Sequence, residues 1–164
     1  LPGSIRMISK KELFKIPLLS SAMKAAEILS VDRQNRQQAI KDLSIAKEKM
    51  ESGIRICMFP EGTRSKTSKM SPLKKGAIRL AIDTNALIIP VAIQDIYKVL
   101  PHKQWLKMEL NHKVTVKVGK AIDCREYDVA HRNQLTELVY NSLQTMLNER
   151  LSEKLNDKPI EEAS

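Results

Sequence analysis

The segment FPEGTRS, residues 59–65, places two opposite charges, Glu61 and Arg64, at the tip of a turn. Pro60 and Gly62 are sufficient to form the turn, so the charged pair indicates a further role. A turn that leads from a strand into a helix presents free backbone N–H groups and the positive end of the helix dipole, which favour an anion. The planar Arg64 guanidinium suits bidentate binding of a phosphate. An ordinary ion pair in a capped turn is the alternative interpretation of this spacing.

A second charged pair follows an apolar run in the same way. Asp32 and Arg33 come directly after a predicted strand at 27–31 and stand just before a helix. If both stretches end neighbouring strands of a parallel sheet, they converge on one cleft, because ligands bind beyond the carboxyl ends of such strands. The two pairs together therefore predict a phosphate site. The alternative is that Asp32 caps the helix and that Arg33 is a solvated surface residue.

Alternating strand and helix patterns must position these residues. Apolar runs predict strands at 4–9, 27–31, 54–59, 86–93 and 113–119. Apolar periodicity predicts four helices. The first spans 10–26 with a break at Pro17, the second lies between a cap at Asn35 and a cap at Gly53, and the others span 74–84 and 129–155. Gln38 stands in the capping-box position relative to Asn35, and Pro90 indicates a strand edge or a strand end. The alternation predicts a single α/β domain at 1–155, with a largely parallel central sheet flanked by helices, a long C-terminal helix and a polar tail at 156–164.

Composition narrows the class of partner. The 164 residues are 42% hydrophobic, which is typical of a folded domain, and carry a net charge of +9. Residues 61–80 alone carry +5, which indicates an anionic partner such as nucleic acid, phospholipid head groups or a phosphorylated substrate. Aromatic residues are only 4%, and no zinc-finger or RNA-recognition signature is present, which disfavours nucleic acid. Cys57 and Cys124 have no metal-site spacing, and no signal peptide or membrane-spanning segment is visible.

Three motifs, in this order, resemble those of the glycerolipid acyltransferases, the family of 1-acyl-glycerol-3-phosphate acyltransferases. ILSVDR resembles the family's first strand motif, FPEGTRS its phosphate-binding motif, and LIIPVAI its later apolar motif with a central proline. KKGAIRLA is similar to the basic helix between them. The resemblance covers roughly residues 4–120. It implies a glycerolphosphate acyltransferase-like fold that transfers an acyl chain from acyl-CoA or acyl carrier protein to 1-acyl-sn-glycerol-3-phosphate, giving phosphatidic acid.

The resemblance also assigns roles to residues. The implied phosphate-binding residues are Arg64, Arg33, Glu61, Gly62 and Thr63, supported by Asp32, Phe59, Pro60 and Ser65. The implied acyl-groove residues are Ile89, Pro90 and Val91. No metal and no cofactor other than the acyl donor is implied. The implied partners are lysophosphatidic acid, the acyl donor and an anionic membrane surface, at the cytoplasmic face of a bacterial inner membrane or its equivalent.

One family motif does not occur in this sequence. The family's catalytic His-x-x-x-x-Asp motif precedes the others, and its histidine acts as general base. None of the three histidines, His102, His112 and His131, has an aspartate five positions later, and all three follow FPEGTRS. Glu61 and Asp32 are assigned to the phosphate pocket, beside arginines that keep their basicity low. We therefore expect most of an acyltransferase domain, starting just after this motif and inactive alone; a non-catalytic module that binds anionic lipid is the alternative.

Overall fold

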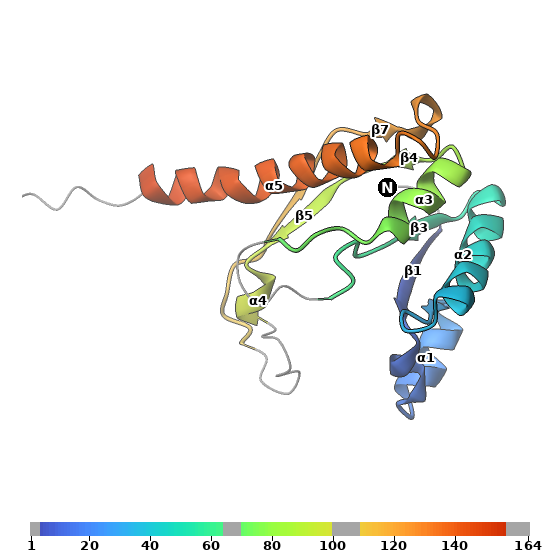
Figure 1. The fold of residues 1–164 in the computed structure, drawn as a ribbon. Helices are drawn as coiled ribbons and strands as arrows, with labels where there is room; N and C mark the ends of the chain where they lie inside the picture. The colour runs from blue at the N-terminus through green and yellow to red at the C-terminus, as the bar shows by residue number, and fades with distance from the viewer. Residues whose placement is uncertain (1–3, 64–69, 100–108, 157–164) are drawn as a thin grey trace, which may run out of the picture.

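The computed structural model describes residues 4–63, 70–99 and 109–156, with side chains described as far as residue 149. Three short strands form a parallel sheet in the order β2-β1-β3. They are β1 (Ile5–Lys10), β2 (Leu29–Val31) and β3 (Arg55–Cys57). Ile8 of β1 is in register with Leu29 of β2, and Ile5 with Arg55 of β3. The carboxyl ends of all three strands therefore lie at one edge of the sheet (Figure 1).

Each parallel connection passes through helical structure. A 3₁₀ helix (Lys11–Lys15) and α1 (Leu19–Ala25) connect β1 to β2, and α2 (Arg36–Glu51) connects β2 to β3. The predicted break at Pro17 is confirmed, because Pro17 lies in the turn between the 3₁₀ helix and α1. The predicted cap of α2 is confirmed as well, because the Asn35 side chain accepts the Gln38 N–H at 3.1 Å.

The segment predicted as one strand at 86–93 is two strands, β4 (Leu87–Ile88) and β5 (Val91–Gln94). Both pair antiparallel, β4 with β7 (Ile122–Asp123) and β5 with β6 (Thr115–Val118). Proline has no N–H for a ladder, so the chain changes partner at Pro90. The single long strand is therefore wrong, although the expectation of a strand end at Pro90 holds.

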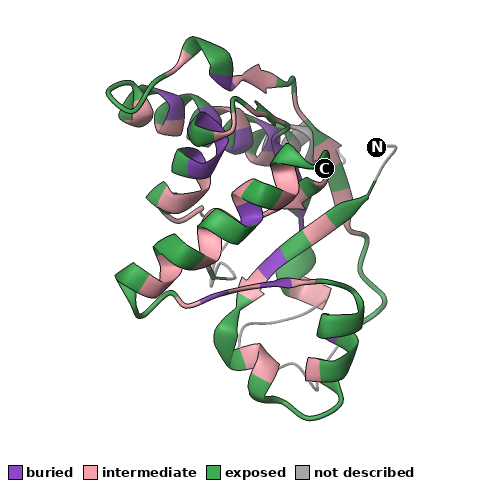
Figure 2. Ribbon diagram, turned by 90° about the vertical axis from the view of Figure 1, so that its right-hand side faces the viewer, coloured by how far each residue is buried: buried purple, intermediate pink, exposed green. Residues whose placement is uncertain are grey.

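Two apolar clusters share α3 (Lys75–Asp83). The first cluster packs α2 and α3 on the parallel sheet, with Ile8, Leu29, Val31, Ala46 and Leu80 buried. The second packs α3 and α5 (Arg132–Asn156) on β5, with Ile78, Ala81, Ile82, Ala92, Leu135 and Val139 among its buried residues. Figure 2 shows the buried residues on the helix and strand faces that meet inside the molecule. Because α3 contributes to both clusters, it joins the two halves of the fold.

The predicted α/β class is confirmed, with a parallel sheet flanked by helices and a long C-terminal helix. The two antiparallel pairs and β7 were not predicted. One further helix, α4 (Ile96–Val99), was not predicted either. Within the described ranges, no helix combines the length and the apolar composition that crossing a membrane requires.

Candidate phosphate site at the carboxyl edge of the sheet

The turn after β3 is tied to the start of α3. The Gly62 N–H donates to the Phe59 carbonyl at 3.0 Å, and Gly62 has a φ of +73°, a conformation that favours glycine. The Pro60 carbonyl accepts the N–H of Lys74, the residue that precedes α3, at 2.7 Å. Phe59 and Thr63 are both exposed. The turn is therefore closed by backbone bonds, which leaves these two side chains at its surface.

The Glu61 carboxylate supports the same connection. Its Oε2 accepts the backbone N–H of Ser71 at 2.7 Å, so it joins the turn to the segment that leads into α3. Among the described residues its partner is thus a backbone N–H group rather than a guanidinium. Arg64 and Ser65, which were predicted for the same site, lie outside the described residues.

Arg33 brings the second motif to this turn. Its Nη1 donates to the Gly62 carbonyl oxygen. The expectation that the two motifs end neighbouring strands is wrong, because β1 lies between β2 and β3. The motifs still converge, because all three strands are parallel and the Arg33 side chain reaches the Gly62 carbonyl.

A further basic side chain flanks Gly62. A Cβ atom placed on Gly62 would stand 3.5 Å from Arg33 Nη1 and 3.3 Å from Lys74 Cγ. Two basic side chains therefore approach this glycine, where a larger residue would crowd both. Lys74, the first residue of the helix predicted at 74–84, was not among the predicted site residues.

Asp32 shapes the loop between β2 and α2. Its Oδ1 accepts the backbone N–H groups of Gln34 at 3.0 Å and of Asn35 at 3.1 Å. These bonds, first that from Asn35 and then that from Gln34, lower the pKa of Asp32, and Lys11 lowers it further. The low basicity expected of this carboxylate is therefore present, but backbone N–H groups cause it rather than arginines. Asp32 does not cap α2, since Asn35 does.

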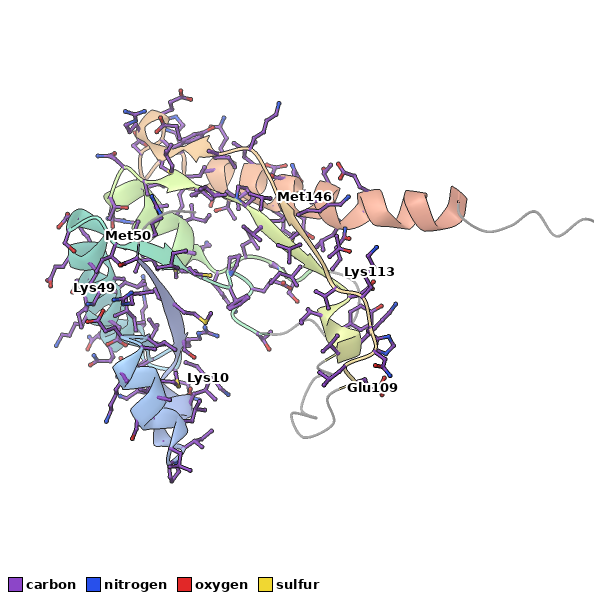
Figure 3. The ribbon with its side chains drawn as sticks, turned by 180° about the vertical axis from the view of Figure 1, so that it is seen from behind. Lys10, Lys49, Met50, Glu109, Lys113 and Met146 are labelled. Carbon is purple, nitrogen blue, oxygen red and sulfur yellow. The ribbon has the colours of Figure 1, made fainter. Side chains whose placement is uncertain are left out.

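The central strand also brings basic residues to the edge. Lys10 ends β1, and Lys11 Nζ lies 3.5 Å from Asp32 Oδ2. A pocket of about 180 Å³ lies here, lined by Lys11, Glu12, Lys15, Asp32 and Gln34. Figure 3 shows Lys10 at this end of β1, well apart from Glu109 and Lys113 on the other side of the molecule. Lys11 lies in the first turn of the helix predicted at 10–26, two residues after the first predicted strand, a position that could have identified it from the sequence.

The described histidines lie away from this edge. His112 Nε2 is 3.0 Å from Glu109 Oε2, and His131 Nδ1 is 2.9 Å from Asp128 Oδ1 just before α5. His102 lies outside the described residues. Across the described ranges, no group of three or more His, Cys, Asp or Glu side chains could hold a metal ion. The described edge therefore combines the cations of Lys11, Arg33 and Lys74 with the carboxylates of Asp32 and Glu61, which already accept backbone N–H groups.

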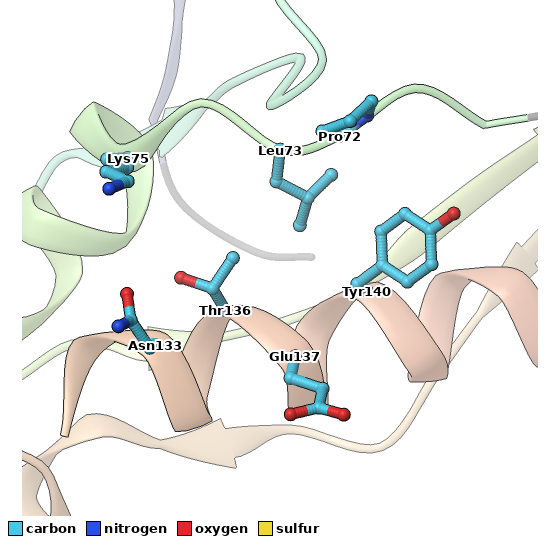
Figure 4. A pocket seen from close by; sticks show the side chains of 7 residues that line it. All are labelled: Pro72, Leu73, Lys75, Asn133, Thr136, Glu137 and Tyr140. Atoms are coloured by element: carbon cyan, nitrogen blue, oxygen red, sulfur yellow. The ribbon is translucent and has the colours of Figure 1, made fainter.

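The residues predicted for an acyl groove lie on the β4–β5 segment. Pro90 is buried, whereas Ile89 and Val91 are 37% and 40% exposed. Val91 pairs with Val118 across β5 and β6, and Val118 is also exposed. The acyl-groove role of these residues stays a prediction. A cavity of about 360 Å³ lies elsewhere, between the segment before α3 and α5 (Figure 4). Its lining includes Leu73, Thr136 and Tyr140 and none of the three predicted groove residues.

Comparison with known proteins identifies the class. Residues 1–94 match the Acyltransferase family model, and the chain belongs to this family. It is 29% identical over 144 residues to a 1-acyl-sn-glycerol-3-phosphate acyltransferase of Cocos nucifera, a match that covers 85% of this chain and 45% of that protein. It is 34% identical over 101 residues to the human 1-acyl-sn-glycerol-3-phosphate acyltransferase alpha, covering 59% of this chain and 36% of that protein.

A solved structure supports the same assignment. The 1-acyl-sn-glycerophosphate acyltransferase PlsC of Thermotoga maritima superposes with a TM-score of 0.71 at 25% identity, covering 93% of this chain and 57% of that chain. The resemblance and the expected fold are therefore confirmed. The chain spans less than half the length of the two sequence relatives described above. The predicted domain extent of 1–155 stays a prediction, because the family match covers residues 1–94.

Proposed function

We propose that this chain provides the acceptor-phosphate site of an O-acyltransferase that acylates 1-acyl-sn-glycerol-3-phosphate to phosphatidic acid, with acyl-CoA or acyl carrier protein as the acyl donor. The observation that carries the proposal is the bond from Arg33 to the Gly62 carbonyl, which joins the two motifs at one edge. A guanidinium has five N–H donors, so Arg33 retains donors for a phosphate oxygen. Arg64, two residues after Gly62, is proposed to bind the same phosphate.

The proposed chemistry needs a general base, and we do not assign that role to either carboxylate of the two motifs. The acceptor hydroxyl attacks the thioester carbonyl carbon, the C–S bond breaks, and the hydroxyl proton is transferred through the base to the departing thiolate. Asp32 and Glu61 already accept backbone N–H groups, so we assign them to holding the site. The base in this family is the histidine of His-x-x-x-x-Asp, a motif that does not occur in these 164 residues. We therefore propose that the chain is inactive alone.

An apolar surface would contact the acyl chain, and a basic surface would contact the membrane. We propose that Ile89, Pro90 and Val91 contact the acyl chain, supported by the exposure of Ile89 and Val91. Ile93, Val116 and Val118 extend the same face across the β5–β6 pair. The charge of +5 over residues 61–80 would face anionic lipid at the cytoplasmic side of a membrane. A non-catalytic lipid-binding module is the second candidate, supported by the same basic charge and the same exposed apolar side chains.

A titration with sn-glycerol 3-phosphate tests the phosphate site. Amide signals in the isotopically labelled chain should shift at Gly62, and glycerol without phosphate should leave them unchanged. Arg33→Ala should weaken the binding. Arg79→Ala, which changes an exposed arginine paired with Asp83 on α3, is the matched control and should not. Equal affinities of the two variants would contradict the proposal.

A further inference from the structure

We propose that Asp42 is a positioning residue for the phosphate site, because its carboxylate fixes the β2–α2 loop in the position from which Arg33 reaches Gly62. The inference rests on the proposed function in one respect only, namely that Arg33 binds the acceptor phosphate. Asp42 itself, on α2, is not proposed to touch the substrate. It was not among the residues that the sequence motifs implied.

The carboxylate of Asp42 connects α2 to the loop that precedes it. Its Oδ2 accepts the backbone N–H of Asp32 at 2.8 Å, and its Oδ1 accepts the side-chain Nε2 of Gln38 at 2.9 Å. The bond to Asp32 spans ten residues and is partly buried. Aspartate is an unfavourable residue inside a helix, so its presence there is explained by a bond made outside the helix.

This bond continues into the residues on either side of Arg33. Asp42 holds the N–H of Asp32, and Asp32 in turn holds the N–H groups of Gln34 and Asn35 through its Oδ1. The backbone is therefore restrained immediately before and immediately after Arg33. Arg33 is exposed, so packing does not fix its side chain. The bond to the Gly62 carbonyl orients its guanidinium, and these backbone bonds fix the position from which the side chain extends.

Positioning matters here because arginine has much rotamer freedom to lose. A side chain that already points at its ligand binds with a smaller entropy cost. The Arg33 guanidinium is aimed at the Gly62 carbonyl before any phosphate is bound. Loosening the backbone under Arg33 should therefore weaken phosphate binding without removing any charge from the site.

Asp42→Asn is the sharpest change for this purpose. Asparagine has the same shape but replaces one acceptor oxygen with an NH₂ donor, so it cannot accept from both Asp32 N–H and Gln38 Nε2. The Kd for sn-glycerol 3-phosphate should rise by about three- to tenfold, the range expected for one lost hydrogen bond. The matched control is Asp83→Asn, which changes an exposed aspartate on α3 and should leave the Kd unchanged.

A double variant separates positioning from a general loss of stability. If Asp42 acts through Arg33, Asp42→Asn should cause no further loss of affinity in the Arg33→Ala background. An undiminished loss there, or no loss in the wild-type background, would overturn the proposal. Should Asp42→Asn not give a folded sample, Gln38→Leu removes a donor from the same carboxylate and should act in the same direction more weakly.

A measurement without ligand distinguishes this inference from the proposed function. Asp42→Asn should speed hydrogen exchange at the Asp32 amide and shift the side-chain Nε–H signal of Arg33. Unchanged signals would overturn the positioning role whatever the affinities are. If both signals change while Arg33→Ala leaves phosphate binding intact, the positioning role stands and the proposed phosphate role of Arg33 is wrong.

Discussion

The Arg33 guanidinium donates to the carbonyl of Gly62, a residue 29 positions further along the chain. The bond joins segments that follow β2 and β3, which lie on either side of β1. A motif that ends one strand is thereby joined to a motif that ends another. The arrangement makes the glycine carbonyl, rather than a carboxylate, the group that orients this arginine.

Replacing Arg64 should weaken binding of the acceptor more than binding of the donor. Loss of a charge-assisted contact to phosphate costs about 1.5–3 kcal/mol, so Arg64→Ala should raise the Kd for sn-glycerol 3-phosphate by about ten- to a hundredfold. Arg64→Lys should recover only part of the affinity, because an ammonium group cannot bind bidentately. Calorimetric titration with the acceptor and with an acyl-CoA measures both. An equal loss for the two ligands would speak against a phosphate role.

Gly62→Ala and Gly53→Ala form a matched pair. Both glycines have positive φ, +73° and +88°, so alanine at either position should cost about 1–2 kcal/mol of unfolding free energy in urea titrations. A Cβ at Gly53 meets nothing within 4 Å, whereas one at Gly62 stands 3.5 Å from Arg33 Nη1. Only Gly62→Ala should therefore weaken binding of sn-glycerol 3-phosphate as well. Similar affinities for the two variants would show that Arg33 and Lys74 adjust freely.

Asp32 should contribute a pH-dependent part of the stability. Folding lowers the pKa of Asp32 from its ordinary value of 3.8, because the ionised carboxylate accepts the N–H groups of Asn35 and Gln34. A lowered carboxylate pKa stabilises the native state above the unfolded pKa, and the contribution is lost as the pH falls through the folded pKa. The difference in unfolding free energy between wild type and Asp32→Asn should be constant above about pH 5 and shrink below it. Parallel pH profiles down to pH 2 would count against this account.

Binding to lipid vesicles should depend on charge. The chain should sediment with vesicles that contain anionic lipid and should not sediment with neutral vesicles. Added salt should weaken the association. At physiological ionic strength, screening limits exposed charges to a reach of about 8 Å. A charge-reducing variant of the basic segment, Lys74→Gln with Lys75→Gln, should bind less. Equal binding to both kinds of vesicle would exclude the electrostatic explanation.

The 164 residues alone should show no normal acyl transfer from acyl-CoA to 1-acyl-sn-glycerol-3-phosphate. General-base assistance typically contributes about 10²–10⁴-fold, and Asp32 and Glu61 already accept backbone N–H groups. A relative's His-x-x-x-x-Asp segment placed ahead of residue 1 should restore transfer, and His→Ala in that segment should remove it again. His112→Ala and His131→Ala are controls without expected effect. Normal turnover by the 164 residues would refute this prediction.

Local patterns predicted the elements of the first half well. Pro17 interrupts a helix and Asn35 caps one where the sequence indicated, because each residue acts through its own backbone or side chain. The outward position of Ile40 was not predictable in this way. Its spacing fits the apolar stripe of α2, yet it is 61% exposed, since only one side of that helix meets the sheet.

The site was predictable as far as its strand ends. Each motif places a charged pair directly after an apolar strand. Because the carboxyl ends of parallel strands point the same way, the convergence of the two motifs could be predicted. Strand order was not predictable from these motifs, and neither were contacts such as that from Asp42 to Asp32, which join an ordinary helix residue to a loop ten positions away. Lys74 was missed for a related reason, because only the closed turn brings it beside Gly62.

The central place of β1 has a consequence for ligand binding at the proposed site. Met7 is in register with Cys57 of β3, and Lys10 with Val31 of β2, so the two motifs are held together by a strand that lies between them. Detaching β1 would let the motifs separate. Conversely, an anion that bound both motifs would favour the arrangement in which β1 is paired, by mass action. The ligand would thus slow hydrogen exchange at the backbone amides of β1, even without touching them. Exchange in this strand would then measure how fully the site is occupied.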